Sequence, residues 1–139
     1  MPGRALIVED ETEIRDLLAY AVSREGCAFD TASDGAEAIA RLESNTYELI
    51  LLDLMMPHVD GHAVLRFLSR MPAQRPIVIV MSARVSLSED ETNVVTAVAK
   101  KPAGIVVILE ILPDLCRTLK ESPMSPATPG DQREDIRRE

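Results

Sequence analysis

Three short, uninterrupted runs of apolar residues constrain the fold more than any other feature. They cover residues 5–8, 49–52 and 77–81, and none contains a polar side chain. A strand with one face in water alternates apolar and polar residues, whereas a strand buried on both faces is apolar throughout. The runs therefore predict the central strands of a parallel sheet that is covered by helices on both faces.

Residues between these runs repeat with the spacing of helices. Two stretches place apolar residues at helical intervals and so predict one buried stripe each. The members are Ile14, Leu17, Leu18, Ala21 and Val22 in the first stretch, and Gly61, Val64, Leu65 and Leu68 in the second.

Two further helices are indicated by the pairs that would cap them. Asp34 with Glu37, and Ser88 with Glu91, have the spacing of a capping box, which predicts helix starts near residues 35 and 89. Weaker strand patterns at residues 27–32 and 97–100 suit the edges of a sheet. The order is then strand and helix five times over, an α/β chain.

The last helix carries more apolar residues than one stripe can use. Its stripe comprises Ile105, Ile108, Leu109, Leu112, Leu115, Cys116 and Leu119. Val106, Val107 and Ile111 fall outside it, and either pack under the fourth helix or form a partner surface. Pro113 removes a backbone hydrogen bond inside this helix, so we expect a bend there.

Composition divides the chain into one domain and a tail, and it restricts the partners. Residues 1–121 form the predicted domain, and residues 122–139, rich in Pro and Ser with few apolar residues, are expected to be disordered.

The net charge of -8 argues against direct nucleic-acid binding. No membrane span or signal-peptide pattern is present, so we expect a cytoplasmic protein. Cys27 and Cys116 suit buried thiols better than a disulfide framework.

Carboxylates follow two of the buried runs. Glu9 and Asp10 end the first, and Asp53 ends the second. If those strands are neighbours in a parallel sheet, the three side chains converge at its carboxyl edge, where ligands bind in open α/β folds. Two carboxylates about 4 Å apart repel by roughly 4 kcal/mol, so three together favour a cation. An all-oxygen ligand set indicates Mg²⁺ or Mn²⁺ and not Zn²⁺.

The same edge offers the groups needed for phosphoryl transfer. Asp53 could attack phosphorus as a nucleophile while a metal neutralises the transferring oxygens. Ser82 ends the third apolar run, and Lys101 follows the last strand directly before Pro102. A hydroxyl and an ammonium can both hold phosphoryl oxygens.

The ordered segments ALIVEDE, LLDLMMPHVDG, VMSA and KKP resemble the signatures of response-regulator receiver domains of two-component systems. The resemblance covers about residues 4–121 and implies a flavodoxin-like, doubly wound sheet of order 2-1-3-4-5 with five helices. It implies that Asp10, Asp53 and the backbone carbonyl of Met55 hold Mg²⁺, with Glu9 acting through water. It also implies Asp53 as phosphoacceptor, Ser82 as switch hydroxyl and Lys101 as phosphoryl contact.

The chain departs from this family in the elements that usually report phosphorylation. Val98 stands where the family has an aromatic switch residue, and Ala103 replaces the usual Phe after Lys-Pro. The interval from Ser82 to Lys101 is also short, so we expect a shortened or irregular fourth helix.

Two functions remain open on these observations. The first is a single-domain response regulator, phosphorylated by a sensor histidine kinase or a histidine phosphotransfer protein. It would act on a downstream protein target and could form a homodimer through the face of helix four, strand five and helix five. The alternative is a degenerate receiver that binds proteins without phosphorylation.

Other activities fit poorly. An Asp-nucleophile phosphatase needs an Asp-x-Asp pair, but Met55 stands at the second position, so we do not expect an enzyme. An FMN protein is disfavoured by the acidic residues after strand one. His58 and His62 are expected to face solvent in a loop and not to bind the metal.

Overall fold

Five parallel strands form the centre of the molecule in the order β2-β1-β3-β4-β5. The computed structural model describes residues 3–71 and 76–121, so the expected disordered tail lies outside the described residues. The strands are β1 (Arg4–Val8), β2 (Ala28–Ala32), β3 (Leu49–Asp53), β4 (Ile77–Ser82) and β5 (Ala97–Lys100). The expected strand order is confirmed, and the two weaker strands, β2 and β5, form the edges.

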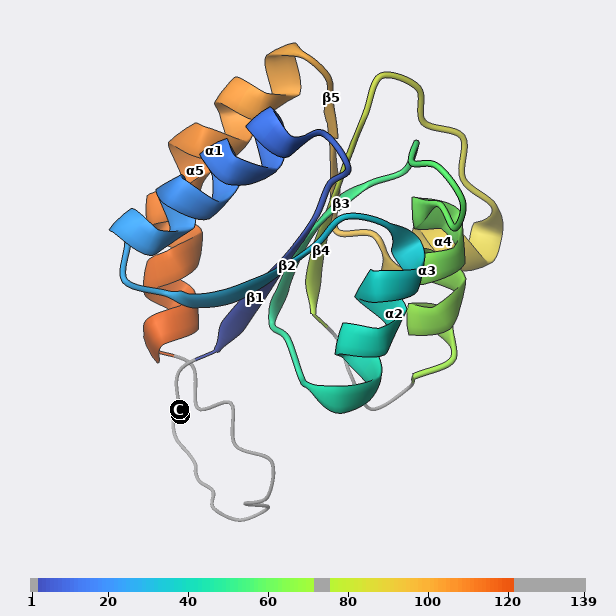
Figure 1. The fold of residues 1–139 in the computed structure, drawn as a ribbon, viewed down its shortest axis with the longest axis horizontal. Helices are drawn as coiled ribbons and strands as arrows, with labels where there is room; N and C mark the ends of the chain where they lie inside the picture. Colours follow the sequence, from blue (N-terminus) through green and yellow to red (C-terminus); the bar gives the residue numbers. More distant parts are fainter. Residues whose placement is uncertain (1–2, 72–75, 122–139) are drawn as a thin grey trace.

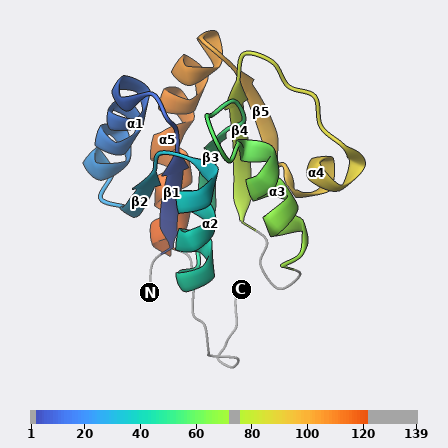
Figure 2. The same ribbon diagram turned by 45° about the vertical axis from the view of Figure 1, so that its right-hand side comes forward.

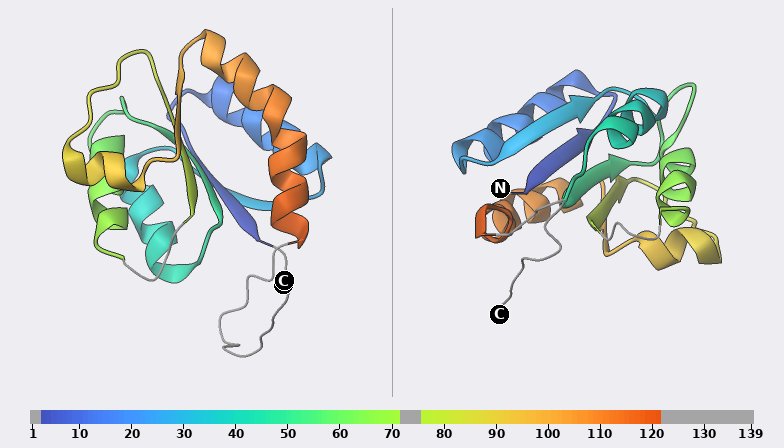
Figure 3. Two further views of the ribbon diagram at one scale, coloured as in Figure 1. Left: turned by 180° about the vertical axis from the view of Figure 1, so that it is seen from behind. Right: turned by 90° about the horizontal axis from the view of Figure 1, so that it is seen from below.

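Five helices cover the two faces of this sheet (Figure 1, Figure 3). One face carries α1 (Thr12–Arg24) and α5 (Ala103–Glu121). The opposite face carries α2 (Gly35–Ser44), α3 (Gly61–Ser69) and α4 (Glu89–Val94). This three-layer arrangement explains why the central strands are apolar on both sides, since helices exclude water from each face.

Alternate residues of the central strands supply two separate cores. Leu6 and Ile50 pack toward α2 and α3, and Ile7 and Leu51 pack toward α1 and α5. The stripe predicted for α3 is buried in full. The stripe predicted for α1 is wrong at Leu17, which is 44% exposed, because only the narrower strip around Leu18 and Val22 meets the sheet and α5.

Side chains at the predicted positions cap α2 and α4. The Asp34 carboxylate accepts from the backbone N–H of Glu37, and Ser88 and Glu91 form a complete capping box. At α2 the reciprocal bond differs from the expected one, because the Glu37 carboxylate accepts from the backbone N–H of Ser33 at 2.8 Å. Each helix start is thus held by side chains next to it in sequence.

The fourth helix is short, as expected, with six residues. Polar contacts of Glu91 join α4 to α3. Glu91 Oε2 lies 3.1 Å from His62 Nδ1 and 3.5 Å from Arg66 Nη1. His62 was expected in a solvent-facing loop, but it is the second residue of α3 and contacts a buried carboxylate. His58 is exposed, as expected, with a φ of 65°.

Helix α5 continues through Pro113 without interruption, and its ribbon changes direction about halfway along (Figure 1). Val106, Val107 and Ile111 are 57%, 51% and 38% exposed. The alternative in which they pack under the fourth helix is wrong, because α4 lies on the opposite face of the sheet.

The two cysteines are buried thiols, as expected. Cys27 Sγ donates a hydrogen bond to the backbone carbonyl of Cys116 at 3.2 Å, which ties the start of β2 to α5. Burial and the neighbouring Cys27 raise the pKa of Cys116 to about 12, so this thiol stays protonated at neutral pH. Among the helices of the described ranges, none has the length and apolar content needed to cross a membrane.

Candidate metal centre

The three predicted carboxylates meet at the carboxyl edge of the sheet. Strands β1 and β3 pair directly, with Val8 opposite Leu52, so Glu9 and Asp53 occupy neighbouring strand ends. Glu9, Asp10 and Asp53 each offer a carboxylate oxygen, and these oxygens lie within 4.8 Å of one another. The convergence expected from the sequence is therefore present (Figure 2 shows the strand ends and the loops around them).

The Lys101 ammonium lies among these carboxylates. Its Nζ is 2.9 Å from Glu9 Oε1 and 3.4 Å from Asp53 Oδ2, and it also lies 3.3 Å from Glu11 Oε1. Glu9 is fully buried, and a buried carboxylate is strongly unfavourable without a partner of opposite charge. Lys101 supplies that charge. The peptide bond that follows it, to Pro102, is cis.

The surroundings of Asp53 shift its proton affinity. Burial and the negative charge of Glu9 raise the pKa of Asp53 to about 7, and a hydrogen bond with the Asp10 side chain acts in the same direction. The backbone N–H of Met55 and the charge of Lys101 oppose this rise in pKa. Asp53 is thus a buried carboxyl with a proton affinity far above that of an exposed one.

Lys101 responds in the opposite sense. Burial lowers the pKa of Lys101, but its contacts with Glu9 and Asp53 outweigh burial and raise the pKa above its ordinary value. The side chain is therefore a cation over the whole physiological pH range. A cation held permanently beside Asp53 can bind an anion that arrives there.

Backbone hydrogen bonds and a close approach to α3 hold the chain around Asp53. The backbone N–H of Met55 donates to Asp53 Oδ1 at 3.1 Å, and that of Gly61 donates to the Leu54 carbonyl at 3.1 Å. A Cβ atom on Gly61 would overlap the Asp53 carbonyl oxygen. Only glycine fits there, because the start of α3 lies directly against the loop that carries Asp53.

Beside these groups lies an open cavity of about 420 Å³, lined by Asp10, Glu11, Asp53, Met55, Ser82, Ala83, Arg84 and Lys101. Ser82 Oγ is buried and has no hydrogen-bond partner among the described residues. A buried hydroxyl normally has one, so this atom is available to a ligand.

The donor set fits a magnesium ion. Its side chains offer carboxylate oxygens, with neither thiolate nor imidazole among the three clustered residues. Hard oxygen ligands suit Mg²⁺, and the cavity has room for the waters that Mg²⁺ retains. The side chain of Met55 is exposed, and the predicted role of its backbone carbonyl as a ligand stays a prediction.

The structure also adds residues that sequence reasoning missed. Glu11 contacts Lys101, and Arg84 lines the cavity two residues after Ser82. Glu11 follows the acidic pair directly, so its acidity was a usable signal. Arg84 has no such signal, because its place depends on the path of the loop after β4.

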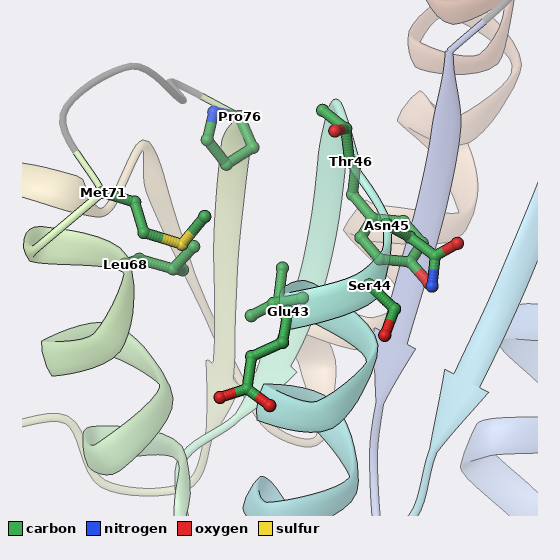
Figure 4. Close-up of a pocket in the computed structure, with 9 residues that line it drawn as sticks. Glu43, Ser44, Asn45, Thr46, Leu68, Met71 and Pro76 are labelled. Atoms are coloured by element: carbon green, nitrogen blue, oxygen red, sulfur yellow. The ribbon is translucent and has the colours of Figure 1, made fainter.

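A second pocket, of about 490 Å³, lies at the other end of the sheet, between the carboxyl ends of α2 and α3 (Figure 4). Its lining mixes polar residues from Glu43 to Thr46 with the apolar Leu68 and Met71. Met71 and Pro76 border residues 72–75, which are not described, so we assign no site there.

Comparison with known proteins places these features in one family. The sequence profile of the response regulator receiver domain matches residues 5–107. The transcriptional regulatory protein TcrA of Mycobacterium tuberculosis is 37% identical over 86 residues, which cover 62% of this chain and 34% of TcrA. ResD of Bacillus subtilis, also a transcriptional regulatory protein, is 55% identical over 64 residues, covering 45% of this chain and 26% of ResD. The chain thus spans about a third or less of these relatives.

Solved structures agree with this assignment. The Francisella response regulator 1452 receiver domain has a TM-score of 0.68 and 26% identity, covering 83% of this chain and 97% of that one. The response regulator TrrA of Thermotoga maritima, solved in complex with Mg²⁺ and BeF, has a TM-score of 0.67 and 28% identity, covering 81% of this chain and 98% of that one. With the five-stranded parallel sheet and the acidic cluster at its carboxyl edge, the chain belongs to the response regulator receiver domain family.

Proposed function

We propose that residues 1–121 form a Mg²⁺-dependent receiver that accepts a phosphoryl group on Asp53 and signals through protein contacts. The observation that carries the proposal is the Lys101 ammonium, 3.4 Å from Asp53 Oδ2 at the wall of an open cavity. A buried carboxylate beside a permanent cation and an unpaired hydroxyl fits a phosphoryl-transfer site better than it fits an ion pair with a purely structural role.

The donor would be a phosphohistidine on a sensor histidine kinase or a histidine phosphotransfer protein. An Asp53 carboxylate oxygen attacks phosphorus, the phosphorus–nitrogen bond breaks, and its electron pair leaves with the imidazole nitrogen. Glu9, Asp10, Asp53 and the Met55 carbonyl would hold Mg²⁺, which when bound neutralises negative charge on the phosphoryl oxygens.

Two side chains of this chain would then hold the transferred group. Lys101 binds a phosphoryl oxygen in place of the Asp53 oxygen that it contacts in this structure. The Ser82 hydroxyl, which lines the same cavity, donates a hydrogen bond to another. Both contacts form only when the negatively charged phosphoryl group is present, so both are absent from the unphosphorylated site.

The experiment is intact-mass spectrometry after incubation with acetyl phosphate and Mg²⁺. We expect a mass gain of one phosphoryl group in the native chain, none in Asp53→Asn, and none when EDTA removes the metal. A matched control is Asp60→Asn, which changes a nearby carboxylate that caps α3 and lies outside the acidic cluster. Asp60→Asn should still gain the phosphoryl mass.

A second candidate is a degenerate receiver that binds partners without phosphorylation. Val98 at the usual position of the switch aromatic and the six-residue α4 favour it. An unmodified mass in the native chain, together with no Mg²⁺ binding by calorimetry, would select this candidate.

The remaining proposals concern the setting. We propose a cytoplasmic signalling module, not an enzyme, that acts on a downstream protein and binds neither nucleic acid nor membrane through this domain. The net charge of -8 supports the absence of nucleic-acid binding. Dimerisation through the α4, β5 and α5 face is proposed because exposed valines lie on β5 and α5.

A further inference from the structure

We infer that Arg15 is a positioning residue that holds the Glu9–Asp10 turn in the geometry that the cation requires. The inference rests on the proposed Mg²⁺ site. Arg15 is the fourth residue of α1 and is not one of the clustered carboxylates. Its effect on the metal would act entirely through the backbone that carries two of the ligands.

The guanidinium of Arg15 reaches back over the turn between β1 and α1. Its Nη1 donates to the Glu9 carbonyl at 3.0 Å and lies 3.5 Å from the Asp10 carbonyl. Its Nη2 lies 3.4 Å from Thr12 Oγ1. One planar group therefore contacts both residues of the acidic pair and the first residue of the helix.

The side chain at the start of α1 does not provide this restraint. Glu11 stands at the N-cap position of α1, and its side chain makes no capping hydrogen bond, unlike Asp34 at α2 and Asp60 at α3. A turn without a cap leaves its carbonyls and N–H groups less restrained. Arg15 restrains this turn from the carbonyl side.

The two acidic residues depend on this restraint to different degrees. The Glu9 side chain is already held, because Oε2 accepts from the Glu11 N–H at 3.1 Å and Oε1 pairs with Lys101. Asp10 is only half-buried, and its side chain hydrogen-bonds Asp53 and not Lys101, so its carboxylate depends more on the backbone of the turn than that of Glu9 does. We therefore expect Asp10 to be the ligand that Arg15 chiefly positions.

Arg15 and Lys101 contact the acidic pair through different atoms. Lys101 binds carboxylate oxygens, for which a metal ion competes. Arg15 binds the carbonyl oxygens of Glu9 and Asp10, which are not among the proposed metal ligands. Its geometry therefore serves the metal-free and the metal-bound site alike, while its positive charge by itself would disfavour Mg²⁺.

That opposition makes the inference testable with two substitutions. Arg15→Met removes the planar guanidinium and its charge. Arg15→Lys keeps the charge but cannot bridge two carbonyls and a hydroxyl. If positioning dominates, both variants bind Mg²⁺ more weakly, Arg15→Met by about tenfold, which is typical for loss of a group that orients a metal ligand. If charge dominates, Arg15→Met binds Mg²⁺ more tightly and Arg15→Lys binds like the native chain.

The measurement is the Mg²⁺ dissociation constant by isothermal titration calorimetry, beside urea unfolding of the metal-free variants. The matched control is Arg24→Met, which removes an exposed arginine from the other end of α1. We expect the control to bind Mg²⁺ like the native chain. We also expect amide resonances of residues 9–12 to broaden in metal-free Arg15→Met, while its unfolding midpoint stays close to that of Arg24→Met.

Three results would overturn the inference. They are an unchanged or tighter Mg²⁺ constant in Arg15→Met, equal weakening in Arg24→Met, or an Arg15→Met chain that is already unfolded without metal while Arg15→Lys binds normally. Failure of the proposed function gives a different result, because the native chain itself would then not bind Mg²⁺.

Discussion

The ionisable residues at the carboxyl edge are held in an unfavourable arrangement. Three carboxylates cluster there, and two of them, Glu9 and Asp53, are buried and share the Lys101 ammonium. The unfavourable energy appears as the raised pKa of Asp53, which burial and Glu9 cause. A site that is destabilised without its ligand binds that ligand with a gain in stability. The electrostatics therefore predict a metal-free protein whose stability depends on pH and on Mg²⁺.

Replacing Asp53 by Asn should stabilise the metal-free protein at neutral pH. The pKa of Asp53 is raised from 3.8 to about 7, so between these values the folded state holds a proton that the unfolded state has lost. Native stability from this group therefore falls as pH rises from about 4 to 7 and is constant above that. Asn does not titrate and avoids the loss, which we expect to be on the order of 2 kcal/mol.

Urea unfolding in EDTA at pH 4.5 and pH 7.5 would measure this difference. The advantage of Asp53→Asn should be larger at pH 7.5, and Mg²⁺ should reverse it by stabilising the native chain alone. An advantage that is the same at both pH values, or larger at pH 4.5, would contradict the assigned pKa shift.

Sequence reasoning identified the acidic site because its members occupy positions that topology determines. Glu9, Asp10 and Asp53 each follow a buried run, and the ends of parallel strands meet at one edge. The acidity of Glu11, directly after this pair, was a further usable signal. The contact of Arg15 with the Glu9–Asp10 turn was not predictable, because it depends on the Arg15 rotamer and on the exact start of α1, which no spacing rule specifies.

At the scale of elements, α4 is attached to the molecule in an unusual way. It has six residues, too few for an independently stable helix, and it packs mainly on α3. Its stability must come from its cap and from its contacts. Glu91 serves both: Oε1 accepts from the Ser88 N–H at 2.9 Å, and Oε2 accepts from His62. Since α3 begins against the Asp53 loop, this carboxylate connects that loop to α4.

Substituting Glu91 by Ala should therefore destabilise the protein by about 1–2 kcal/mol, because a cap bond and a bond between helices are lost together. The measurement is urea unfolding at pH 7, with hydrogen exchange of the α4 amides as a local probe. Glu89→Ala is the control, since Glu89 is exposed in the same first turn. Equal losses of unfolding free energy in both variants would show that the contact between Glu91 and α3 contributes nothing to stability.

The same contact has a defined pH dependence. Burial raises the pKa of Glu91, but the bonds from Ser88 and His62 outweigh it and lower the pKa below the ordinary value of 4.5. A lowered pKa means that the stabilisation is present above that value and is lost as pH falls through the folded-state pKa. The difference between native and Glu91→Ala chains should shrink accordingly in acid.

Element positions were more predictable than the faces that the elements bury. Cap spacing located the starts of α2 and α4, and apolar runs located the central strands. Exposure of Leu17 was not predictable, and exposure of the apolar residues outside the α5 stripe was only one of two alternatives, because periodicity shows that a stripe exists but not how wide the opposing surface is. That width depends on how α1 and α5 lie beside each other on the sheet.

For the whole molecule, the layer order leaves apolar side chains exposed on the last helix and on the edge strand. Val106, Val107 and Ile111 are exposed on α5, and Val98 is 45% exposed on the edge strand β5. Ala99 packs in the core beneath α5, so Val98, one residue earlier, points to the opposite face, where α4 lies. The short α4 packs on α3 and leaves Val98 uncovered. An edge strand flanked by apolar residues is a surface that a second copy can cover.

If that surface forms the proposed dimer, charge placed on it should weaken association. We expect the chain treated with acetyl phosphate and Mg²⁺ to sediment as a dimer. The double variant Val107→Asp with Ile111→Asp should raise the dimer dissociation constant at least about tenfold, because both charges would be buried against apolar atoms. Analytical ultracentrifugation over a concentration series measures this constant. Leu17→Asp is the matched control, an exposed apolar residue on α1 outside the proposed face. Loss of the dimer in Leu17→Asp alone would place the interface on α1, and a chain that stays monomeric at every concentration would leave the α5 residues as a surface for a different protein.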